Sequence, residues 1–331
     1  MRNTDLIEEI SITEMERLRI GNAQDQEAQT GVTVLLFDGG ASVGVDISGG
    51  GPASRETPLT SPVTADNPIN AIVLSGGSAY GLAAADGVMR YLEEHGIGYE
   101  TGFAKVPLVC QSCIYDLGLG RADVRPDAKM GYAACVDAEQ YLSSEGSDAT
   151  GLCDSLGAGT GAAVGKLCGM ERATKTGLGV CAFSLGELKI AAIVVLNALG
   201  DVFDPENGQK VAGLRAADGV GFSDTCEELY RLTQRTDLFT GNTTIGAVIT
   251  NGKFSKAELT KIASMTRNAY ARCIRPVGTL ADGDTIYAAS VGDVPADINV
   301  TGTLAADVMA EAIRRAASCT RDSDGSRMQT R

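Results

Sequence analysis

The sequence predicts a mixed α/β fold in which layers of sheet are covered by helices. First, the chain has 331 residues, of which 44% are hydrophobic and 21% charged, enough to bury a large core. Second, apolar runs rich in β-branched residues alternate with stretches of helical periodicity. Third, neither an internal repeat nor a domain-scale linker interrupts this pattern. We therefore expect a layered α/β or an α+β structure, formed as a single domain over residues 1–331.

The first third of the chain predicts a hairpin, a loop and a strand–turn–helix unit. Residues 31–49 contain two β-rich runs joined at Asp38-Gly39-Gly40, a hairpin signal. Residues 50–68 are rich in Pro, Gly, Ser and Thr, as loops are. Residues 70–96 then predict a strand, a glycine turn and a long helix that ends at His95-Gly96.

The middle of the chain predicts a helix, a glycine-rich loop, a second short helix and two strong strands. These elements are expected, in that order, over residues 126–143, 145–161, Ala162–Cys168, 177–186 and 188–202. A polar segment follows, over 201–240.

The last third predicts two strands and two helices. The run "FTGNTTIGAVITN" over 239–251 leads from a polar turn into a strand, since Ile245, Ala247 and Ile249 alternate with their neighbours. Residues 255–274 begin with a capping box and predict a helix. A strand over 284–292 and a helix over 304–318 precede a polar tail.

The charge and the lack of long apolar runs narrow the class of protein. The formal net charge is −14, which opposes binding to nucleic acid or to an anionic membrane. The first residues show no apolar signal core, and no run approaches the roughly 18 apolar residues of a membrane span. We therefore expect a cytoplasmic protein.

Segments that partly match cofactor and metal motifs lack the neighbouring residues that those motifs require. Cys110 and Cys113 form a C-x-x-C without a second pair or a nearby histidine, so buried thiols are expected instead of zinc. "GAGTGAAVG" (157–165) follows a polar loop and lacks the acid that ends a dinucleotide unit. No P-loop occurs, and "ADGDT" (281–285) is not continued as a calcium loop. We expect neither metal nor cofactor.

The single histidine argues against catalytic nucleophiles that depend on a histidine base. His95 is the only histidine, and its place at a helix C-terminus explains it. A Ser-His-Asp or Cys-His enzyme is therefore ruled out. "LSGGSAYG" (74–81) departs from a nucleophile elbow at Tyr80, which leaves a tight strand-to-helix turn or an anion cradle.

Thr243 fits a design that needs no histidine. If the chain is cut before Thr243, its Oγ is the nucleophile and its new α-amine, with an ordinary pKa of about 8, is the base. A plain turn before a strand is the alternative. Asp282 and Asp284 would share one face at the start of a strand, where two acids can tune an amine or a hydroxyl.

Five long motifs carry a resemblance to a known family. They are "SGGSAYGLAAADGVMRYLEEHG", "ISGGGPASRETPL", "VPLVCQSCIYDL", "GNTTIGAVITN" and "RPVGTLADGDTIYAAS". Together they resemble the DmpA-like family of L-aminopeptidase/D-esterase-amidases, β-peptidyl aminopeptidases and nylon-oligomer endo-hydrolases, in unbroken order over residues 9–317. The resemblance implies an N-terminal-nucleophile hydrolase with a layered αββα fold, made as a precursor that cuts itself between Asn242 and Thr243.

The resemblance also implies roles for individual residues. Asn197 is similar to the family's oxyanion donor, Lys166 to the Lys near the nucleophile, and Asp282 and Asp284 to the acids that hydrogen-bond the nucleophile and its amine. Tyr115 is similar to a pocket tyrosine. From the residues alone, Asn197 could equally cap a strand end, and Lys166 could lie on a solvated helix face.

The expected activity is hydrolysis of amide bonds in short peptides or peptide-like amides, by fragments 1–242 and 243–331 that stay together. The Asn-Thr junction is closer to the nylon-oligomer branch, and Cys113 stands where some aminopeptidases carry an acid. An endo-acting hydrolase of linear ω-amino-acid oligomers, an acyltransferase on the same fold and an unprocessed binding protein remain as alternatives. The resemblance further implies a homo-oligomer, often a tetramer.

Overall fold

The structure is a computed structural model that describes residues 6–140, 155–232 and 241–318. One path of paired strands runs β1-β11-β12-β15-β17-β3-β5-β8-β4, with β2 also paired to β3. The strands span Ile7–Ile10 (β1), Leu18–Asp25 (β2), Thr30–Ile47 (β3), Ala53–Arg55 (β4), Ile69–Ser75 (β5), Val109–Cys113 (β8), Leu178–Leu185 (β11), Leu188–Val195 (β12), Ile245–Gly252 (β15) and Thr285–Val294 (β17).

Strand β3 folds this path into two layers, and here the expected hairpin over 31–49 is wrong. Gly39 and Gly40 have φ of 80° and 78°, and the pairing register shifts between Leu36 and Ala41. The first half of β3 pairs with β2 and β5, whereas the second half pairs with β17. The two left-handed glycines therefore bend one long strand from one sheet to the other and do not reverse it.

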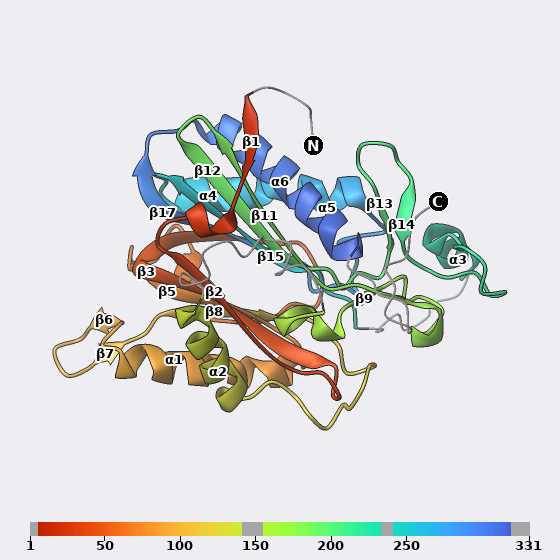
Figure 1. Cartoon of the computed structure of the whole chain (residues 1–331), viewed down its shortest axis with the longest axis horizontal. Coiled ribbons are helices and arrows are strands. Elements are labelled where there is room, and N and C mark those ends of the chain that lie inside the picture. Colours follow the sequence, from red (N-terminus) through yellow and green to blue (C-terminus); the bar gives the residue numbers. More distant parts are fainter. Residues whose placement is uncertain (1–5, 141–154, 233–240, 319–331) are drawn as a thin grey trace.

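Helices cover both outer faces (Figure 1). Helices α1 (Ala84–Glu94) and α2 (Ala128–Glu139) pack on the sheet of β2, β5 and β8. Helices α4 (Lys256–Thr266), α5 (Asn268–Cys273) and α6 (Ile298–Ser318) cover the sheet of β11, β12, β15 and β17. Helix α3 (Thr225–Arg231) lies at the side of the molecule.

Three apolar cores separate the four layers. The central core lies between the two sheets and contains Ile72 and Leu74 from one and Ile193 and Ile245 from the other. The outer cores join each sheet to its helices. Successive strand residues point to opposite faces, so a strand buried on both sides is apolar along most of its length; β12 is apolar except for the half-buried Lys189. The layered αββα fold expected from the sequence is confirmed.

Smaller elements complete the chain. A ribbon pairs β6 (Tyr99–Glu100) with β7 (Lys105–Val106), and another pairs β9 (Ala163–Val164) with β10 (Thr174–Lys175). A three-stranded sheet contains β13 (Asp201–Phe203), β14 (Lys210–Ala212) and β16 (Ile274–Arg275).

Several expected boundaries need correction. The short helix expected at Ala162–Cys168 is wrong: β9 lies there, because Ala163 N–H bonds Asn197 Oδ1 and Gly165 has a φ of 70°. The helix expected over 255–274 divides into α4 and α5, and the strand expected over 188–202 ends at Val195. The loop expected over 50–68 contains β4 and a 3-10 turn, Thr57–Thr60. Residues 145–154 of the expected glycine-rich loop lie outside the described residues.

Candidate active site

The turn before β15 is bound into the centre of the sheet. Strand β15 lies between antiparallel β12 and parallel β17, and an isolated parallel bridge pairs Asn242 with Asp282. Thr243 N–H donates to the Asn197 carbonyl at 2.7 Å, and Gly283 N–H donates to the Asn242 carbonyl at 3.0 Å. Backbone pairing thus extends to Asn242 and Thr243, which precede β15, and fixes the backbone on both sides of the bond between them.

The Thr243 hydroxyl lies against the bond that precedes it. Thr243 Oγ1 donates a hydrogen bond to the carbonyl oxygen of Asn242, and the side chain is only 5% exposed. Gly283 makes this position possible, because a Cβ there would lie 2.7 Å from Thr243 Oγ1. A hydroxyl, the carbonyl group that precedes it and a backbone N–H donor to that carbonyl are therefore assembled at one point.

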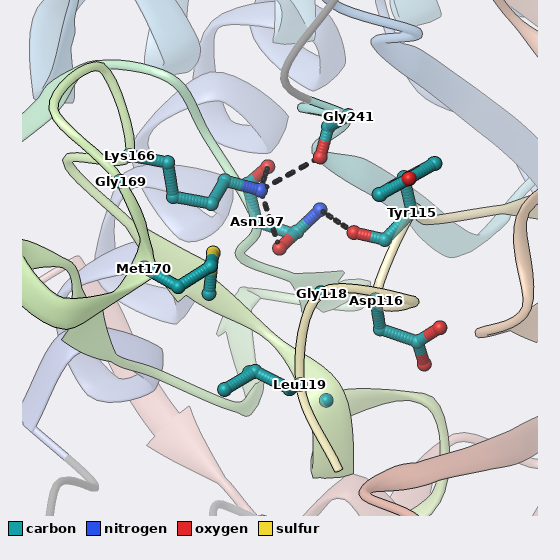
Figure 2. Close-up of a pocket in the computed structure, with 10 residues that line it drawn as sticks. Tyr115, Asp116, Gly118, Leu119, Lys166, Gly169, Met170, Asn197 and Gly241 are labelled. Atoms are coloured by element: carbon teal, nitrogen blue, oxygen red, sulfur yellow. Dashed lines mark hydrogen bonds between the residues drawn. The ribbon is translucent and has the colours of Figure 1, made fainter. Parts of the chain in front are cut away.

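Lys166 and Asn197 form a buried polar pair beside this bond (Figure 2). Lys166 Nζ donates to Asn197 Oδ1 and to the Gly241 carbonyl, both at 2.8 Å. Asn197 Oδ1 also accepts from Ala163 N–H at 3.1 Å, and its Nδ2 donates to the Tyr115 carbonyl at 3.2 Å. Since Lys166 is 3% exposed, the alternative of a solvated helix face is wrong.

Burial dominates the charge state of Lys166. Removal from water lowers the pKa of Lys166 to about 7, against the opposing attraction of Asp282, Asp116 and Asp284. A lysine tuned in this way can hold its proton or lose it near neutral pH. Perturbed groups of this kind are typical of catalytic sites.

The two acids lie side by side before β17 and bind backbone amides. Asp284 accepts from Thr244 N–H at 2.7 Å and Gly278 N–H at 3.1 Å, and Asp282 accepts from Thr279 N–H and Oγ1, both at 2.7 Å. Burial and the charge of Asp282 raise the pKa of Asp284 to about 7; burial also raises the pKa of Asp282.

These bonds differ in detail from the sequence expectation. Asp284 binds the amide of Thr244, the residue after the proposed nucleophile, instead of Thr243 itself. Asp284 therefore holds the backbone before β15 against the backbone before β17, whereas the Asp282 side chain binds Thr279. Both acids also supply negative charge that faces Lys166.

A cavity of about 230 Å³ opens beside the pair. Its lining residues are Tyr115, Asp116, Gly118, Leu119, Gly161, Lys166, Gly169, Met170, Asn197 and Gly241. Of the predicted site residues, Tyr115, Lys166 and Asn197 meet at one cavity, whereas Thr243, Asp282 and Asp284 are buried and do not line it. The cavity is largely apolar away from Lys166, with Leu119 and Met170 on one side (Figure 2).

Gly241 fits closely against Tyr115. Gly241 has a φ of 65°, and a Cβ on it would lie 2.0 Å from Tyr115 Cδ1. Only glycine allows both the left-handed turn and this contact. The close contact places the chain before the Asn242–Thr243 bond against the wall of the cavity.

Asp116 and Gly283 were missed by sequence reasoning. Asp116 is buried, accepts from Gly77 N–H and Thr30 Oγ1, both at 2.7 Å, and burial raises its pKa. Its position directly after Tyr115 was a usable signal. Gly283, between the two acids of "ADGDT", carried none, since a close approach of backbone to Thr243 is visible only in three dimensions.

The motifs that were set aside have structural roles. His95 caps α1, with Nδ1 2.7 Å from the Tyr91 carbonyl and its ring stacked on Tyr91. Cys113 is buried against Ser75 at 3.0 Å from Sγ to Oγ, away from the cavity. "LSGGSAYG" forms the tight turn from β5 toward α1, and its Gly77 amide binds Asp116.

Solved structures with a similar fold include N-terminal-nucleophile hydrolases. A β-aminopeptidase from Burkholderia sp. matches with a TM-score of 0.63 at 19% identity, over 96% of this chain and 89% of that chain. An L-aminopeptidase D-Ala-esterase/amidase from Ochrobactrum anthropi, described as a variant of this fold, matches with a TM-score of 0.64 at 14% identity, over 92% and 85%.

The model of peptidase family S58 matches residues 10–330. The chain belongs to peptidase family S58, which confirms the DmpA-like resemblance, and it is a hydrolase that acts on amide bonds. An uncharacterized aminopeptidase of Mycobacterium leprae is 37% identical over 86% of this chain and 80% of its own length. A 6-aminohexanoate-oligomer endohydrolase of Kocuria sp. is 33% identical over 90% and 83%.

None of the helices in the three described ranges combines the length and apolar content that crossing a bilayer requires.

Proposed function

We propose that this chain is a self-processing N-terminal threonine hydrolase of short peptides or peptide-like amides. It cuts itself between Asn242 and Thr243 and then works through an acyl-enzyme on Thr243. The observation that carries the proposal is the position of Thr243 Oγ1 on the Asn242 carbonyl, whose oxygen also accepts from Gly283 N–H.

Self-processing follows as an N-to-O acyl shift and a hydrolysis. Thr243 Oγ attacks the Asn242 carbonyl carbon, while Gly283 N–H stabilises the negative charge on the oxygen. The bond from Asn242 carbon to Thr243 nitrogen breaks, an ester to Oγ forms, and the hydroxyl proton ends on the nitrogen. Water then adds to the ester, which releases the Asn242 carboxylate and restores the Thr243 hydroxyl.

In turnover the new α-amine of Thr243 is the general base. It takes the Oγ proton as Oγ attacks a substrate amide, and it delivers a proton to the leaving amine as the carbon–nitrogen bond breaks. Water hydrolyses the acyl-enzyme by the same route. The Asn197 carbonyl already accepts from this nitrogen at 2.7 Å and would orient it.

The surrounding residues set charge and position. Lys166 Nζ lies 3.4 Å from the Asn197 carbonyl oxygen that Thr243 N–H also binds, so its positive charge would depress the pKa of the new amine. Asn197 holds Lys166 and could donate to a substrate oxyanion. Asp282 and Asp284 oppose the positive charge, and Tyr115 bounds the acyl side.

We propose further that fragments 1–242 and 243–331 remain one domain after the cut. Strand β15 lies at the centre of its sheet, between β12 and β17, with apolar cores on both faces. Separating the fragments would expose these cores, so the cut removes one covalent bond and leaves the packing intact.

An endo-acting hydrolase of ω-amino-acid oligomers is the second candidate. The likeness to the 6-aminohexanoate-oligomer endohydrolase favours it. An acyltransferase on this fold would instead pass the acyl group to an added amine. Product analysis with and without an amine acceptor separates hydrolysis from transfer.

The proposal is tested by comparing wild type with Thr243→Ala. Wild type should give two fragments and amidase activity, and Thr243→Ala should give neither. A processed or active Thr243→Ala protein would refute the mechanism.

We also propose a cytoplasmic homo-oligomer, a tetramer by analogy with the family. Light scattering of the purified protein would measure the number of subunits. A monomer at the concentration used in the activity assay would refute the proposed oligomer and would leave the proposed Thr243 mechanism unaffected.

A further inference from the structure

The segment Gly241–Asn242 occupies the acyl side of the bond that Thr243 attacks. The carbonyl of Asn242 accepts from Gly283 N–H at 3.0 Å, and the carbonyl of Gly241 accepts from Lys166 Nζ at 2.8 Å. The bridge of Asn242 to Asp282 aligns the segment with the chain that leads into β17. Each successive carbonyl of the segment thus meets a donor supplied by the protein.

The segment is a template for substrate, because one Oγ carries out both reactions. A substrate carbonyl must reach Thr243 Oγ1 where the Asn242 carbonyl now lies. The substrate residue that supplies this carbonyl then superimposes on Asn242. Any acyl group on the nitrogen of that residue superimposes on the Gly241 carbonyl. Lys166 is fixed there independently of the segment, since Asn197 Oδ1 also accepts from its Nζ at 2.8 Å.

The positive charge of Lys166 distinguishes substrates with a free amino group on the scissile residue from substrates in which that nitrogen is acylated. In an amino-terminal substrate, the nitrogen that corresponds to Asn242 N would be an ammonium. That atom and the Gly241 oxygen belong to one planar peptide group and lie roughly 2.3 Å apart. A substrate ammonium would therefore lie within about 5 Å of the Lys166 ammonium.

The three carboxylates that act on Lys166 are already engaged. Asp284 accepts from Thr244 N–H and Gly278 N–H, and Asp282 accepts from Thr279 N–H and Oγ1. Asp116, which lines the cavity, accepts from Gly77 N–H and Thr30 Oγ1. An acylated nitrogen carries no charge and also brings the carbonyl oxygen that Lys166 can bind.

We propose that the site selects acyl donors in which the nitrogen of the scissile residue is itself acylated. These are internal bonds of peptides and N-acyl amino-acid amides, in preference to bonds next to a free α-amine. The inference rests on the proposed Thr243 chemistry and deepens it by naming the substrate class. The cavity beside Gly241, with Leu119 and Met170, would receive the remainder of the acyl group.

Three chromogenic substrates with one leaving group test the proposal on processed wild-type enzyme. They are asparagine p-nitroanilide, N-acetyl-asparagine p-nitroanilide and glycyl-asparagine p-nitroanilide. The second and third carry a carbonyl where Gly241 has one, and the third also keeps a free amine one residue further away. We expect kcat/KM at pH 7 to be at least about 10-fold higher for both than for the first.

The difference should narrow as pH rises, because the free α-amine of the first substrate and the Lys166 ammonium, whose pKa is lowered to about 7, then both lose their charge. Equal rates at pH 7, or faster cleavage of the first substrate, would overturn the proposal. Processed enzyme that cleaves none of the three would overturn it as well, because the template requires the second and third to bind. An intact-mass spectrum of the same sample shows separately whether the chain has cut itself; an uncut chain would refute the Thr243 chemistry instead.

Discussion

Substitution of Gly283 by alanine tests the geometry of the nucleophile most sharply. The added Cβ would lie 2.7 Å from Thr243 Oγ1 and 2.8 Å from the Gly51 carbonyl oxygen. An ordinary contact begins at 3.4 Å, so Thr243 Oγ1 or the Gly283 backbone must move by about 0.7 Å. Both movements disturb the same reaction, since Gly283 N–H is the donor to the Asn242 carbonyl.

The size of the effect follows from this displacement. A 1 Å misplacement of a reacting group can reduce a rate by about 100-fold, so a shift of this size predicts self-processing slowed by roughly 10- to 100-fold. Overpacking should also lower the free energy of unfolding by about 1–3 kcal/mol. The assay is a time course of precursor and fragments after synthesis, followed by gel and intact mass, with urea unfolding of the same samples.

Gly51→Ala is the matched control. Its Cβ would meet only the Asp282 carbonyl oxygen, at 3.9 Å, so it should process and unfold like wild type. Gly283→Ala that processes at the wild-type rate would refute the placement of Thr243 against Gly283. A loss of rate that is equally large in Gly51→Ala would show that the loop, and not the contact with the nucleophile, is responsible.

Three further predictions follow from the same site. Thr243→Ser keeps a hydroxyl and should still cut itself, whereas Thr243→Ala should stay whole on mass spectrometry; an uncut Thr243→Ser would count against hydroxyl chemistry. Lys166→Met removes the cation held between Asn197 and Gly241, and kcat should fall by about 100-fold or more in processed enzyme; an unchanged kcat would make Lys166 structural. Asp116→Asn removes a negative charge that raises the pKa of Lys166, so Lys166 should lose its proton at a lower pH than in wild type. If activity needs protonated Lys166, the alkaline limb of the kcat–pH profile should move to lower pH; an alkaline limb that stays in place or moves to higher pH would contradict this role.

Local pattern was enough to predict much of the fold. The unit over 70–96 appears as β5, a 3-10 turn and α1 with His95 as its cap, and the apolar runs 177–186 and 188–195 form β11 and β12. These segments were predictable because hydrophobic periodicity and helix caps are properties of neighbouring residues.

The misassigned elements depend on contacts from distant parts of the chain. The glycines at 39 and 40 signal a reversal locally, but β3 continues through them because each half finds a different sheet to pair with. Residues 162–168 have helical composition, yet Ala163 and Val164 form a strand, and a hydrogen bond joins Ala163 N–H to Asn197 Oδ1. Tertiary pairing outweighs local propensity in both places.

The candidate site shows the same division. Thr243 was proposed from the turn before its strand, and Lys166 and Asn197 were proposed from the family resemblance; the structure brings the three to one point. Gly283 was not identified, because its role is to leave space for Thr243, and the sequence alone does not show that the two residues are neighbours. The acids were identified as a pair, but their partners, such as Thr244 N–H, depend on the register between β15 and β17.

The central claim is that Thr243 becomes the amino terminus of a fragment and acts from there. The most direct measurement is an intact-mass spectrum of purified wild-type protein, with N-terminal sequencing of the smaller species. We predict fragments 1–242 and 243–331, the second beginning Thr-Thr-Ile-Gly-Ala. A chain that stays whole while it hydrolyses amides, or a fragment that begins at any other residue, would contradict the account.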